Sequence, residues 1–353
     1  MGNGSNIGAA VIGYGGMGSW HTRKIKEIKG LELVGIYDIL PARREAAGEK
    51  GIHAYASREE LLADSRVQLV VVATPNDFHK EIAIDAMAAG KDVISEKPVA
   101  LGSEELEDMI AASEKYGRLF TVHQNRRWDE DYLTTRKIIG GNQLGPVYHI
   151  ESRVQGDRGV PGDWRNRKAQ GGGMVLDWGV HLLDQVLMIK EKQKLTSVYA
   201  QLTFVTSDEV DDGFRTMLTF DDGTTAYVEV TTSNFVKLPR WYVLGKNGSA
   251  LIEDWGLKGK IVKVSDWENR EAVPVQAGAG LTKTMAPRTD DTIKKYRLPK
   301  VKADWGRYYQ NIVAALNGKE DVIVTHAQMR RSTKLMEAIF KSAETNSVVT
   351  FEE

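Results

Sequence analysis

Apolar runs alternate with amphipathic segments over about the first 123 residues of the chain. Most of the runs are nearly continuous Val, Ile and Leu, which is typical of strands buried on both faces of a parallel sheet. We place these strands at residues 7–12, 31–37, 67–73, 92–95 and 119–123. Segments with helical spacing lie between them, at residues 17–29, 41–50, 77–89 and 103–116. This alternation predicts right-handed βαβ crossovers and therefore an α/β fold with a doubly wound parallel sheet of the Rossmann type.

The pattern changes after residue 145. A strand is predicted at 146–155, a loop rich in Gly, Arg and Pro at 157–173, and a helix at 173–189. Four or five strands follow at hairpin spacing, at 195–206, 213–220, 224–233, 240–246 and 249–254. Helices at 304–317 and 326–345 close the chain. The second half is therefore expected to be an α+β domain with a mostly antiparallel open sheet.

These two patterns predict two domains, which also suits a length of 353 residues. Residues 1–125 form the Rossmann dinucleotide-binding domain, and residues 126–353 form a substrate-binding and oligomerisation domain whose last helix is able to pack back on the first. Residues 270–300 have no hydrophobic period, so we expect a long mobile loop that acts as a lid or a subunit contact. Residues 1–6 are expected to be a short disordered lead-in.

The composition excludes several kinds of protein. The formal net charge of −1 gives no reason to expect nucleic acid or an anionic membrane as a partner, and no run of 18 apolar residues exists to span a membrane. The chain has no cysteine, which rules out disulfides, thiol catalysis and cysteine-ligated metal and fits a reducing compartment. We therefore expect a cytoplasmic protein that acts on a small molecule.

The loop after the first strand has the glycine spacing of a dinucleotide-binding site, and a helix follows it. Gly13 allows a tight turn, Gly15 lets the backbone approach a diphosphate, and Gly18 lets the helix pack close to the strand. The N–H groups at the start of the helix then point at the phosphates. The whole loop is predicted to bind the cofactor, and it consists of Gly13, Tyr14, Gly15, Gly16, Met17 and Gly18.

Asp38 ends the second strand, twenty residues after Gly18. A carboxylate at this place accepts hydrogen bonds from the adenosine ribose hydroxyls and repels a 2′-phosphate, so we expect NAD as the cofactor in preference to NADP. Arg43 and Arg44 keep the alternative open, because either guanidinium is able to reach a 2′-phosphate.

Four further segments carry a family resemblance. They are Ala73-Thr74-Pro75-Asn76-Asp77-Phe78-His79, Glu96-Lys97-Pro98, Gln124-Asn125-Arg126-Arg127-Trp128-Asp129, and Gly171-Gly172-Gly173 followed by Asp177, Gly179 and His181. In this order and spacing the chain resembles the Gfo/Idh/MocA family of glucose–fructose oxidoreductase and inositol dehydrogenases. The resemblance implies a Rossmann domain followed by an open-sheet domain whose free face makes homodimers or homotetramers.

The resemblance also implies a cofactor and substrate site at the carboxyl edge of the parallel sheet, where α/β proteins bind ligands. Beyond the glycine loop and Asp38, the residues expected to bind the cofactor are Thr74, Pro75, Asn76, His79, Glu96, Lys97, Gln124, Trp164 and Arg165. Those expected to bind the substrate are Lys97, Asn125, Arg126, Trp164, Asp177 and His181. For Trp164 simple packing is an equal alternative.

Lys97, Asp177 and His181 are the predicted catalytic residues. Lys97 would lower the pKa of a bound hydroxyl, and its structural alternative is a salt bridge with Glu96. Asp177 and His181 stand four residues apart, so on an α-helix they share a face, and the carboxylate would orient the imidazole as a general base. Asp184 falls on the same face and is interpreted as structural. A metal site on Asp177, His181 and Asp184 is the weaker alternative, and we expect no metal.

Other polar residues of these segments are interpreted as structural. One of Arg126 and Arg127 is expected to form an ion pair with Asp129 or Glu130. The histidines without a matching motif are expected to be non-catalytic, and they are His21, His53, His149 and His326.

The expected activity is NAD-dependent oxidation of a ring secondary hydroxyl of a sugar, glycoside or inositol to the ketone. Scyllo-inositol dehydrogenation and oxidation of a glycoside at C3 with tightly bound, recycled NAD both remain open, because loops such as 155–170 and 270–300 read the substrate. An NAD-dependent glycoside hydrolase and a non-catalytic NAD(H) sensor are the remaining alternatives.

Overall fold

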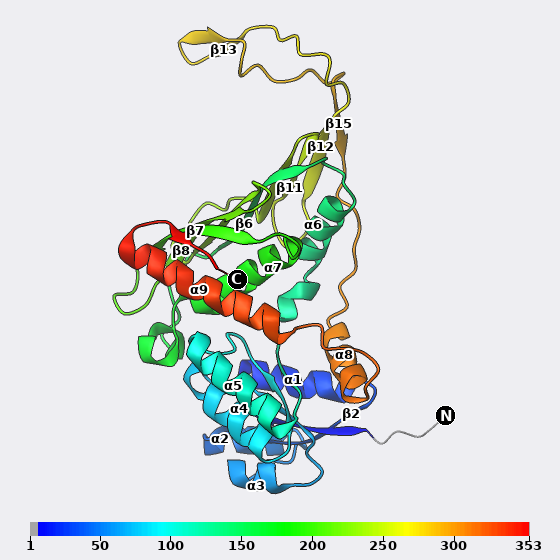
Figure 1. The fold of residues 1–353 in the computed structure, drawn as a ribbon, viewed down its shortest axis with the longest axis vertical. Helices are drawn as coiled ribbons and strands as arrows, with labels where there is room; N and C mark the ends of the chain where they lie inside the picture. Colours follow the sequence, from blue (N-terminus) through cyan, green and yellow to red (C-terminus); the bar gives the residue numbers. More distant parts are fainter. Residues whose placement is uncertain (1–5, 353) are drawn as a thin grey trace.

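The computed structural model describes residues 6–352, so all but Asn6 of the predicted lead-in lies outside the described residues. Two sheets lie one beyond the other along the long axis of the molecule (Figure 1). The smaller sheet is built from the first 122 residues and the larger one from residues after 146. Among the described residues, no helix combines the length and the apolar character that a membrane crossing requires.

The first sheet is parallel, with the strand order β2-β1-β3-β4-β5. Its strands are β1 (Ile7–Ile12), β2 (Leu31–Tyr37), β3 (Leu69–Val72), β4 (Asp92–Ser95) and β5 (Phe120–Val122). The helices that connect them are α1 (Gly16–Glu27), α2 (Pro41–Gly48), α3 (Arg58–Ala63), α4 (His79–Ala88) and α5 (Ser103–Tyr116). β3 is buried at every position, as its unbroken apolar run predicts. The Rossmann prediction is confirmed.

The second sheet is mixed and mostly antiparallel, with the order β15-β12-β11-β10-β6-β9-β8-β7-β16. Its longer strands are β6 (Val147–Gln155), β7 (Leu195–Thr203), β8 (Gly213–Phe220), β9 (Thr225–Thr231), β10 (Trp241–Gly245) and β11 (Gly248–Ile252). β12 (Gly259–Val264), β15 (Ile293–Tyr296) and β16 (Val349–Thr350) complete it. β6 pairs in parallel with β9 at the centre of the sheet, and every other pairing is antiparallel.

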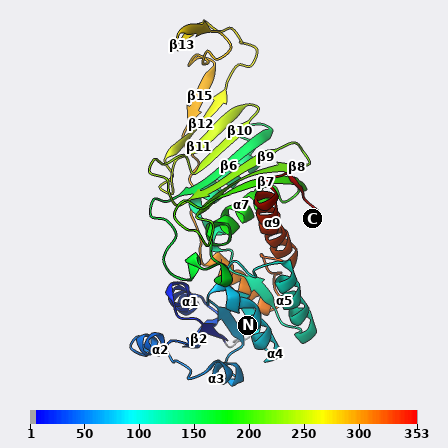
Figure 2. The same cartoon turned by 90° about the vertical axis from the view of Figure 1, so that its left-hand side faces the viewer.

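Helices cover one face of this sheet (Figure 2). They are α6 (Glu130–Gly140), α7 (Val180–Ile189) and α9 (His326–Thr345). The strands alternate accordingly: in β8 every second side chain from Phe214 to Phe220 is buried, and the residues between them are exposed or half-buried. The sheet therefore has one packed face and one face without a covering helix.

Two helices near the C-terminus contribute side chains to the first hydrophobic core, although they follow the second sheet in the chain. The first core takes in Tyr308, Tyr309 and Ile312 from α8 (Arg307–Leu316). α9 belongs to both cores, since Met329 near its start packs in the first and Leu335 packs in the second. The last helix therefore packs in both cores. The predicted domain boundary at residue 125 stays a prediction.

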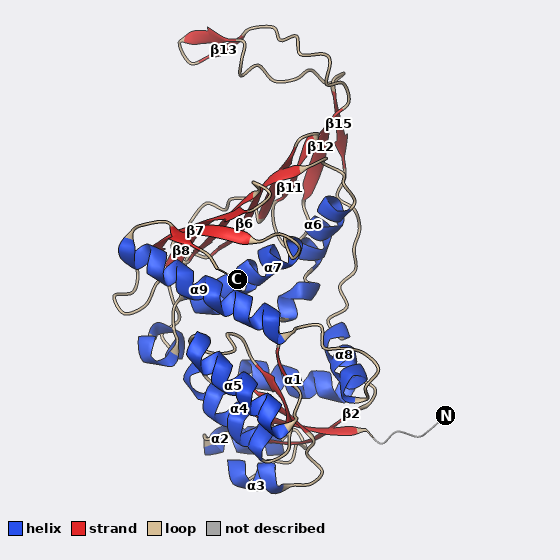
Figure 3. Ribbon diagram, in the orientation of Figure 1, coloured by secondary structure: helices blue, strands red, loops and turns tan. Residues whose placement is uncertain are grey.

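Several elements were not expected from the sequence. α6 carries Thr134, Thr135, Ile138 and Ile139, whose branched side chains disfavour helix, but tertiary packing buries the first three. Within 270–300 the chain forms the hairpin β13 (Val275–Ala277) and β14 (Gly280–Thr282) as well as β15. The rest of that segment is loop, and it stands away from the sheet as an arm (Figure 3).

Candidate active site

The glycine loop between β1 and α1 leaves open space where a diphosphate would lie. Gly13 has a φ of +94°, and a Cβ there would lie 2.5 Å from the carbonyl oxygen of Ala73. A Cβ on Gly18 would lie 1.8 Å from the carbonyl oxygen of Gly13, so only glycine lets the helix pack this closely. A Cβ on Gly16 would meet nothing within 4 Å. The first turn of α1 also has no side-chain cap, so its N–H groups remain available for phosphate oxygens.

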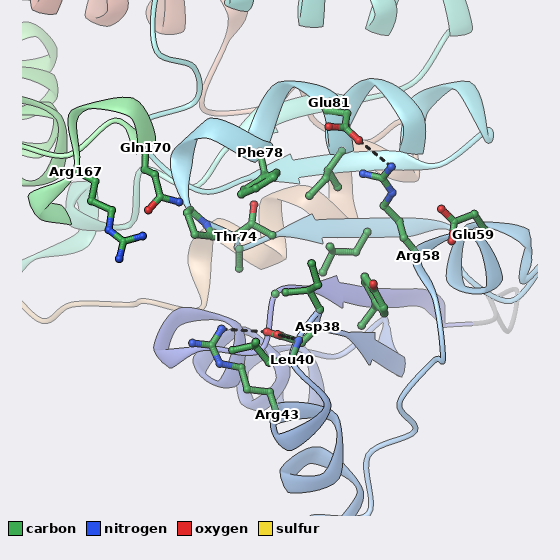
Figure 4. A pocket seen from close by; sticks show the side chains of 17 residues that line it. Asp38, Leu40, Arg43, Arg58, Glu59, Thr74, Phe78, Glu81, Arg167 and Gln170 are labelled. Carbon is green, nitrogen blue, oxygen red and sulfur yellow. Dashed lines mark hydrogen bonds and ion pairs between the residues drawn. The ribbon is translucent and has the colours of Figure 1, made fainter. Parts of the chain in front are cut away.

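Asp38 joins the glycine loop to a large cavity at the end of β2. Its Oδ2 accepts the Tyr14 N–H at 2.7 Å, and its Oδ1 accepts the Leu40 N–H at 2.9 Å. The carboxylate is 3% exposed and borders a cavity of ≈ 690 Å³ (Figure 4). Arg43 donates to Asp38 Oδ2 at 3.2 Å, and Arg44 donates to the Asp38 carbonyl oxygen at 2.6 Å. Both arginines that were considered for a 2′-phosphate are thus engaged around Asp38.

Figure 4 also shows what encloses this cavity on its other sides. Arg58 pairs with Glu81 at 2.8 Å across one end. Arg167 and Gln170 reach toward it from the loop of the second half of the chain. The cavity therefore has the position and size for the adenosine half of a dinucleotide.

A second cavity of ≈ 450 Å³ continues from the first along the carboxyl edge of the sheet. The two share Arg43, Ala73, Thr74 and Pro75. Its other lining residues are Gly15, Gly16, Met17, Asn76, Glu96, Lys97, Asp163, Trp164 and Arg165. We call the two cavities together the trough. The open space at Gly16, the Asp38 carboxylate at the first cavity and the continuous trough fit NAD.

The remaining residues predicted to bind the cofactor differ in position. Thr74 and Pro75 line both cavities of the trough, and Asn76 lines the second while its Nδ2 donates to the Gly171 carbonyl oxygen at 2.8 Å. The buried His79 ring lies 2.8 Å from the Pro98 carbonyl oxygen and 3.1 Å from that of Thr74, so it fixes two loops and does not border the trough. Gln124 is buried and likewise does not border the trough.

Lys97 connects the two halves of the chain. Its Nζ donates to Asp177 Oδ1 at 3.0 Å and to the Asp177 carbonyl oxygen at 2.9 Å. Arg165 Nε lies 3.4 Å from the other oxygen of the same carboxylate. Although burial opposes ionisation, Lys97 and Arg165 lower the pKa of Asp177 below its usual value. The alternative salt bridge of Lys97 with Glu96 is not formed, so an ionised carboxylate of the second half fixes the lysine of the first.

The expectation that Asp177 orients His181 is wrong in this structure. The Asp177 carboxylate contacts Lys97 and Arg165, and His181 Nδ1 is buried without a hydrogen-bond partner in the described part of the chain. Val175–Gly179 is a π-helix, and α7 begins only at Val180, so the segment is not the single α-helix that the expected contact assumed. The carboxylate is held instead by Lys97 and Arg165, which come from other segments of the chain.

His181 lies close to the pair formed by Lys97 and Asp177. It is 5% exposed, and its ring centroid lies 6.1 Å from that of Trp178. Burial, together with the nearby charges of Lys97 and Arg126, holds the pKa of His181 well below its usual value. The imidazole is therefore neutral at neutral pH and able to accept a proton.

Asn125 and Arg126 border a further cavity of ≈ 210 Å³. The Arg126 guanidinium lies 4.2 Å from the Trp178 ring centroid and pairs with Asp129 at 2.9 Å. This ion pair with Asp129 is one of those considered from the sequence. Asn125 and Arg126 therefore line a cavity that shares Met17 with the trough.

Asp184 is buried against Arg127, with 2.6 Å between the carboxylate and the guanidinium. This agrees with its interpretation as structural. The alternative metal site on Asp177, His181 and Asp184 is contradicted, because the two carboxylates pair with different cations.

A buried network beneath Lys97 was missed from the sequence. Glu96 Oε1 lies 2.8 Å from His21 Nε2 and 2.8 Å from His123 Nδ1, and Tyr309 Oη lies 2.5 Å from His21 Nδ1. Although burial favours the neutral acid, His123 and His21 hold the pKa of Glu96 well below its usual range. Glu96 Oε2 also accepts the Lys97 N–H at 3.2 Å. This network fixes the backbone from which Lys97 reaches Asp177.

Two sequence signals pointed toward this network. His21 follows the glycine loop by three residues, and His123 ends the predicted strand 119–123 at the ligand-binding edge of the sheet. Neither position shows that both rings converge on Glu96, because that contact joins residues 75 and 27 positions apart.

Asp211 holds the start of the segment that carries Asp177. Its Oδ2 accepts the Val175 N–H at 2.8 Å, and its carbonyl oxygen accepts the Met174 N–H at 3.0 Å. A Cβ on Gly173 would lie 2.1 Å from Asp211 Oδ1, so glycine is required there. Burial raises the pKa of Asp211 to about 7. The folded chain therefore favours the protonated acid.

This raised pKa predicts a pH-dependent stability. Below the unfolded pKa of about 4 both states are protonated, and stability is lost as the pH rises from there to about 7. Asp211→Asn retains an acceptor for the Val175 N–H but does not titrate. We expect the melting temperature of the wild type to fall relative to this variant between about pH 4 and pH 7 and to level off above it, measured by thermal unfolding. A difference between the two proteins that is the same at every pH would contradict the assignment.

Comparisons with known proteins cover both halves of the chain. Residues 7–124 match the family model described as an oxidoreductase family with an NAD-binding Rossmann fold. Residues 132–251 match the model of the GFO/IDH/MocA C-terminal domain.

Individual relatives extend over the whole chain. A solved NAD-binding protein from Listeria innocua is 47% identical, with a TM-score of 0.96 over 98% of this chain and 100% of that one. A scyllo-inositol 2-dehydrogenase (NADP(+)) of Bacillus subtilis is 26% identical over 98% of this chain and 96% of its own length. The WlbA dehydrogenase from Bordetella pertussis, solved with NADH and UDP-GlcNAcA, shares the fold at 21% identity, with a TM-score of 0.78 and 99% of each chain covered.

Proposed function

Because the chain belongs to the Gfo/Idh/MocA family of NAD-binding oxidoreductases, we propose that it oxidises a ring secondary hydroxyl of a sugar, glycoside or inositol to the ketone. The observation that carries this proposal is the ion pair between Lys97, which lines the trough, and Asp177. The charge of Lys97 also lowers the pKa of the buried His181. Lys97 belongs to the first half of the chain and the other two belong to the second, so in the proposed complex the substrate lies between the halves.

The reaction divides into two transfers from the same CH–OH group. NAD, when bound, accepts the hydride from carbon, and the protein has to take the proton from oxygen. The glycine loop and Asp38 hold the cofactor in the proposed complex, and Trp164 and Arg165 border it from the second half. The products are the ketone, the reduced cofactor and one proton.

His181 is the proposed base. Its imidazole is neutral at neutral pH because burial and two neighbouring cations lower its pKa. Lys97 is the proposed electrostatic partner, since its ammonium stabilises the charge that grows on the substrate oxygen as the proton leaves. Asp177 keeps the ammonium in place through two acceptor atoms. In this proposal Asp177 positions the Lys97 ammonium. This role replaces the orientation of His181 that was expected of Asp177 from the sequence.

The most direct test is reduction of NAD and NADP with inositols, free aldoses and aryl glycosides, followed by absorbance of the reduced cofactor. We expect NAD to be reduced faster than NADP, with at least one cyclic polyol or glycoside as donor. Retention of NAD through purification would favour the glycoside oxidation with recycled cofactor over inositol dehydrogenation. Release of an aglycone would indicate the hydrolase alternative. Binding of NAD(H) without reduction by any donor would contradict the dehydrogenase and support the sensor.

The charge of Arg126 predicts a shift in the pH profile. Because this guanidinium contributes to the low pKa of His181, Arg126→Gln raises that pKa. The acidic limb of kcat/KM should therefore move to higher pH, measured as NAD reduction across the pH range. Arg270→Gln, on the exposed arm, is the matched control and should leave the limb unchanged. A limb that stays in place in Arg126→Gln would argue against His181 as the base.

We also propose that the uncovered face of the second sheet forms a homodimer or homotetramer contact. Helices cover only its other face (Figure 2), and Met217 on β8, which lies between the buried Thr216 and Leu218, is 37% exposed. Light scattering of the purified protein measures this directly.

A further inference from the structure

A fourth cavity, of ≈ 290 Å³, is lined in part by Asp177. It lies at the end of β6 and β9, against the π-helical turn that precedes α7. Met174, Val154 and Val230 supply apolar wall, and Trp178 and Trp255 supply two aromatic rings. Asp157 and Arg158 are exposed and stand among its lining residues. The wall is thus apolar and aromatic apart from the Asp177 carboxylate, and its other charged residues are exposed.

This cavity adjoins the proposed reacting groups. Asp177 lines it directly and bonds to Lys97, whose Nζ lies 3.0 Å from Asp177 Oδ1. Trp178 also lines it, and the ring centroid of Trp178 lies 6.1 Å from that of His181. A ligand whose reacting ring touched Lys97 and His181 would therefore have this cavity beside it.

The two tryptophans form an incomplete aromatic stack. Their ring centroids are 6.0 Å apart at 38°, and Trp255 is 50% exposed. The Arg126 guanidinium packs 4.2 Å from the Trp178 ring centroid and supports that ring from within the protein. Large exposed aromatic surface in a concave site is the kind that sugar or aryl rings cover on binding.

Resting on the proposed function, we propose that this cavity binds the second ring of a glycoside while the ring to be oxidised lies against Lys97 and His181. An inositol or a free monosaccharide has one ring and would leave Trp178 and Trp255 uncovered. A glycoside with an aryl or sugar aglycone extends beyond the reacting ring and covers them. The cavity thus selects a glycoside among the substrates that the proposed function allows.

Trp255→Ala tests the subsite, because a half-exposed side chain is removed with little cost to the fold. The donors are phenyl and methyl glucosides of both anomers, with NAD reduction as the readout. We expect kcat/KM for the phenyl glucoside to fall by about 10-fold and that for the methyl glucoside by less than about 3-fold, in line with loss of one aromatic contact. Trp267→Ala is the matched control, since Trp267 is exposed just before the arm and its ring contacts Arg288. Equal losses for both donors in Trp255→Ala would overturn the subsite.

A binding measurement separates this proposal from the proposed chemistry. Phenyl and methyl glucosides are titrated into the NADH-saturated protein by calorimetry, where no oxidation takes place. Tighter binding of the phenyl glucoside, lost in Trp255→Ala and kept in Trp267→Ala, supports the subsite even if no donor reduces NAD. Equal affinity for the two glucosides overturns the subsite even if an inositol is oxidised.

Discussion

Replacing His181 with alanine is expected to lower kcat by about 10²- to 10⁴-fold, the usual contribution of a general base. The imidazole is buried beside Lys97 and is neutral because burial and the cations around it lower its pKa. Without it, the proposed base for the proton of the substrate hydroxyl is lost. Affinity for NAD should change little, because His181 does not line the trough that the cofactor is proposed to occupy.

The measurement compares steady-state NAD reduction with the dissociation constant for NADH from fluorescence titration. His53→Ala is the matched control, since that ring is exposed and packs against Tyr55, away from the trough. Near-wild-type turnover in His181→Ala would remove His181 from the mechanism. A large loss of NADH affinity would show that the residue supports the cofactor site and not the proton transfer.

Gly18→Ala is expected to lower the stability of the protein, whereas Gly16→Ala is expected to lower its affinity for NADH. A Cβ at Gly18 would lie 1.8 Å from the Gly13 carbonyl oxygen, a contact with backbone that the loop cannot relieve locally. Overpacking of this kind costs about 1–3 kcal/mol, which lowers the melting temperature by roughly 2–10 °C. A Cβ at Gly16 meets nothing within 4 Å and instead enters the space proposed for the diphosphate.

Gly16→Ala should therefore keep the wild-type melting temperature and bind NADH about 10-fold or more weakly, a loss of roughly 1.4 kcal/mol. Thermal unfolding and NADH titration of the two variants together distinguish a packing glycine from a ligand-binding glycine. Unchanged NADH affinity in Gly16→Ala would place the diphosphate elsewhere, and unchanged stability in Gly18→Ala would contradict the packing geometry.

The sequence predicted the elements with strong local periodicity. The buried runs of the parallel sheet, the glycine loop, and helix 326–345 lie where the pattern placed them, because each depends on residues close together in the chain. It did not predict α6, whose branched residues disfavour helix and which packing stabilises. It also did not predict β12, β15 and β16, short strands that only their partners define.

The candidate site divides in the same way. Gly13, Gly18 and Asp38 could be assigned roles from sequence alone, because a turn, a close approach and a strand end are local properties. The partner of Asp177 could not, since it is a lysine 80 positions earlier that only the packing of the two halves brings to this carboxylate. The convergence of His21 and His123 on Glu96, and the aromatic cavity beside Asp177, likewise depend on side chains that only the packing of two sheets brings together. The sequence by itself determined the Rossmann fold and its closely packed glycine loop, because both depend on local pattern, while the tertiary structure decided which charged groups pair across the site.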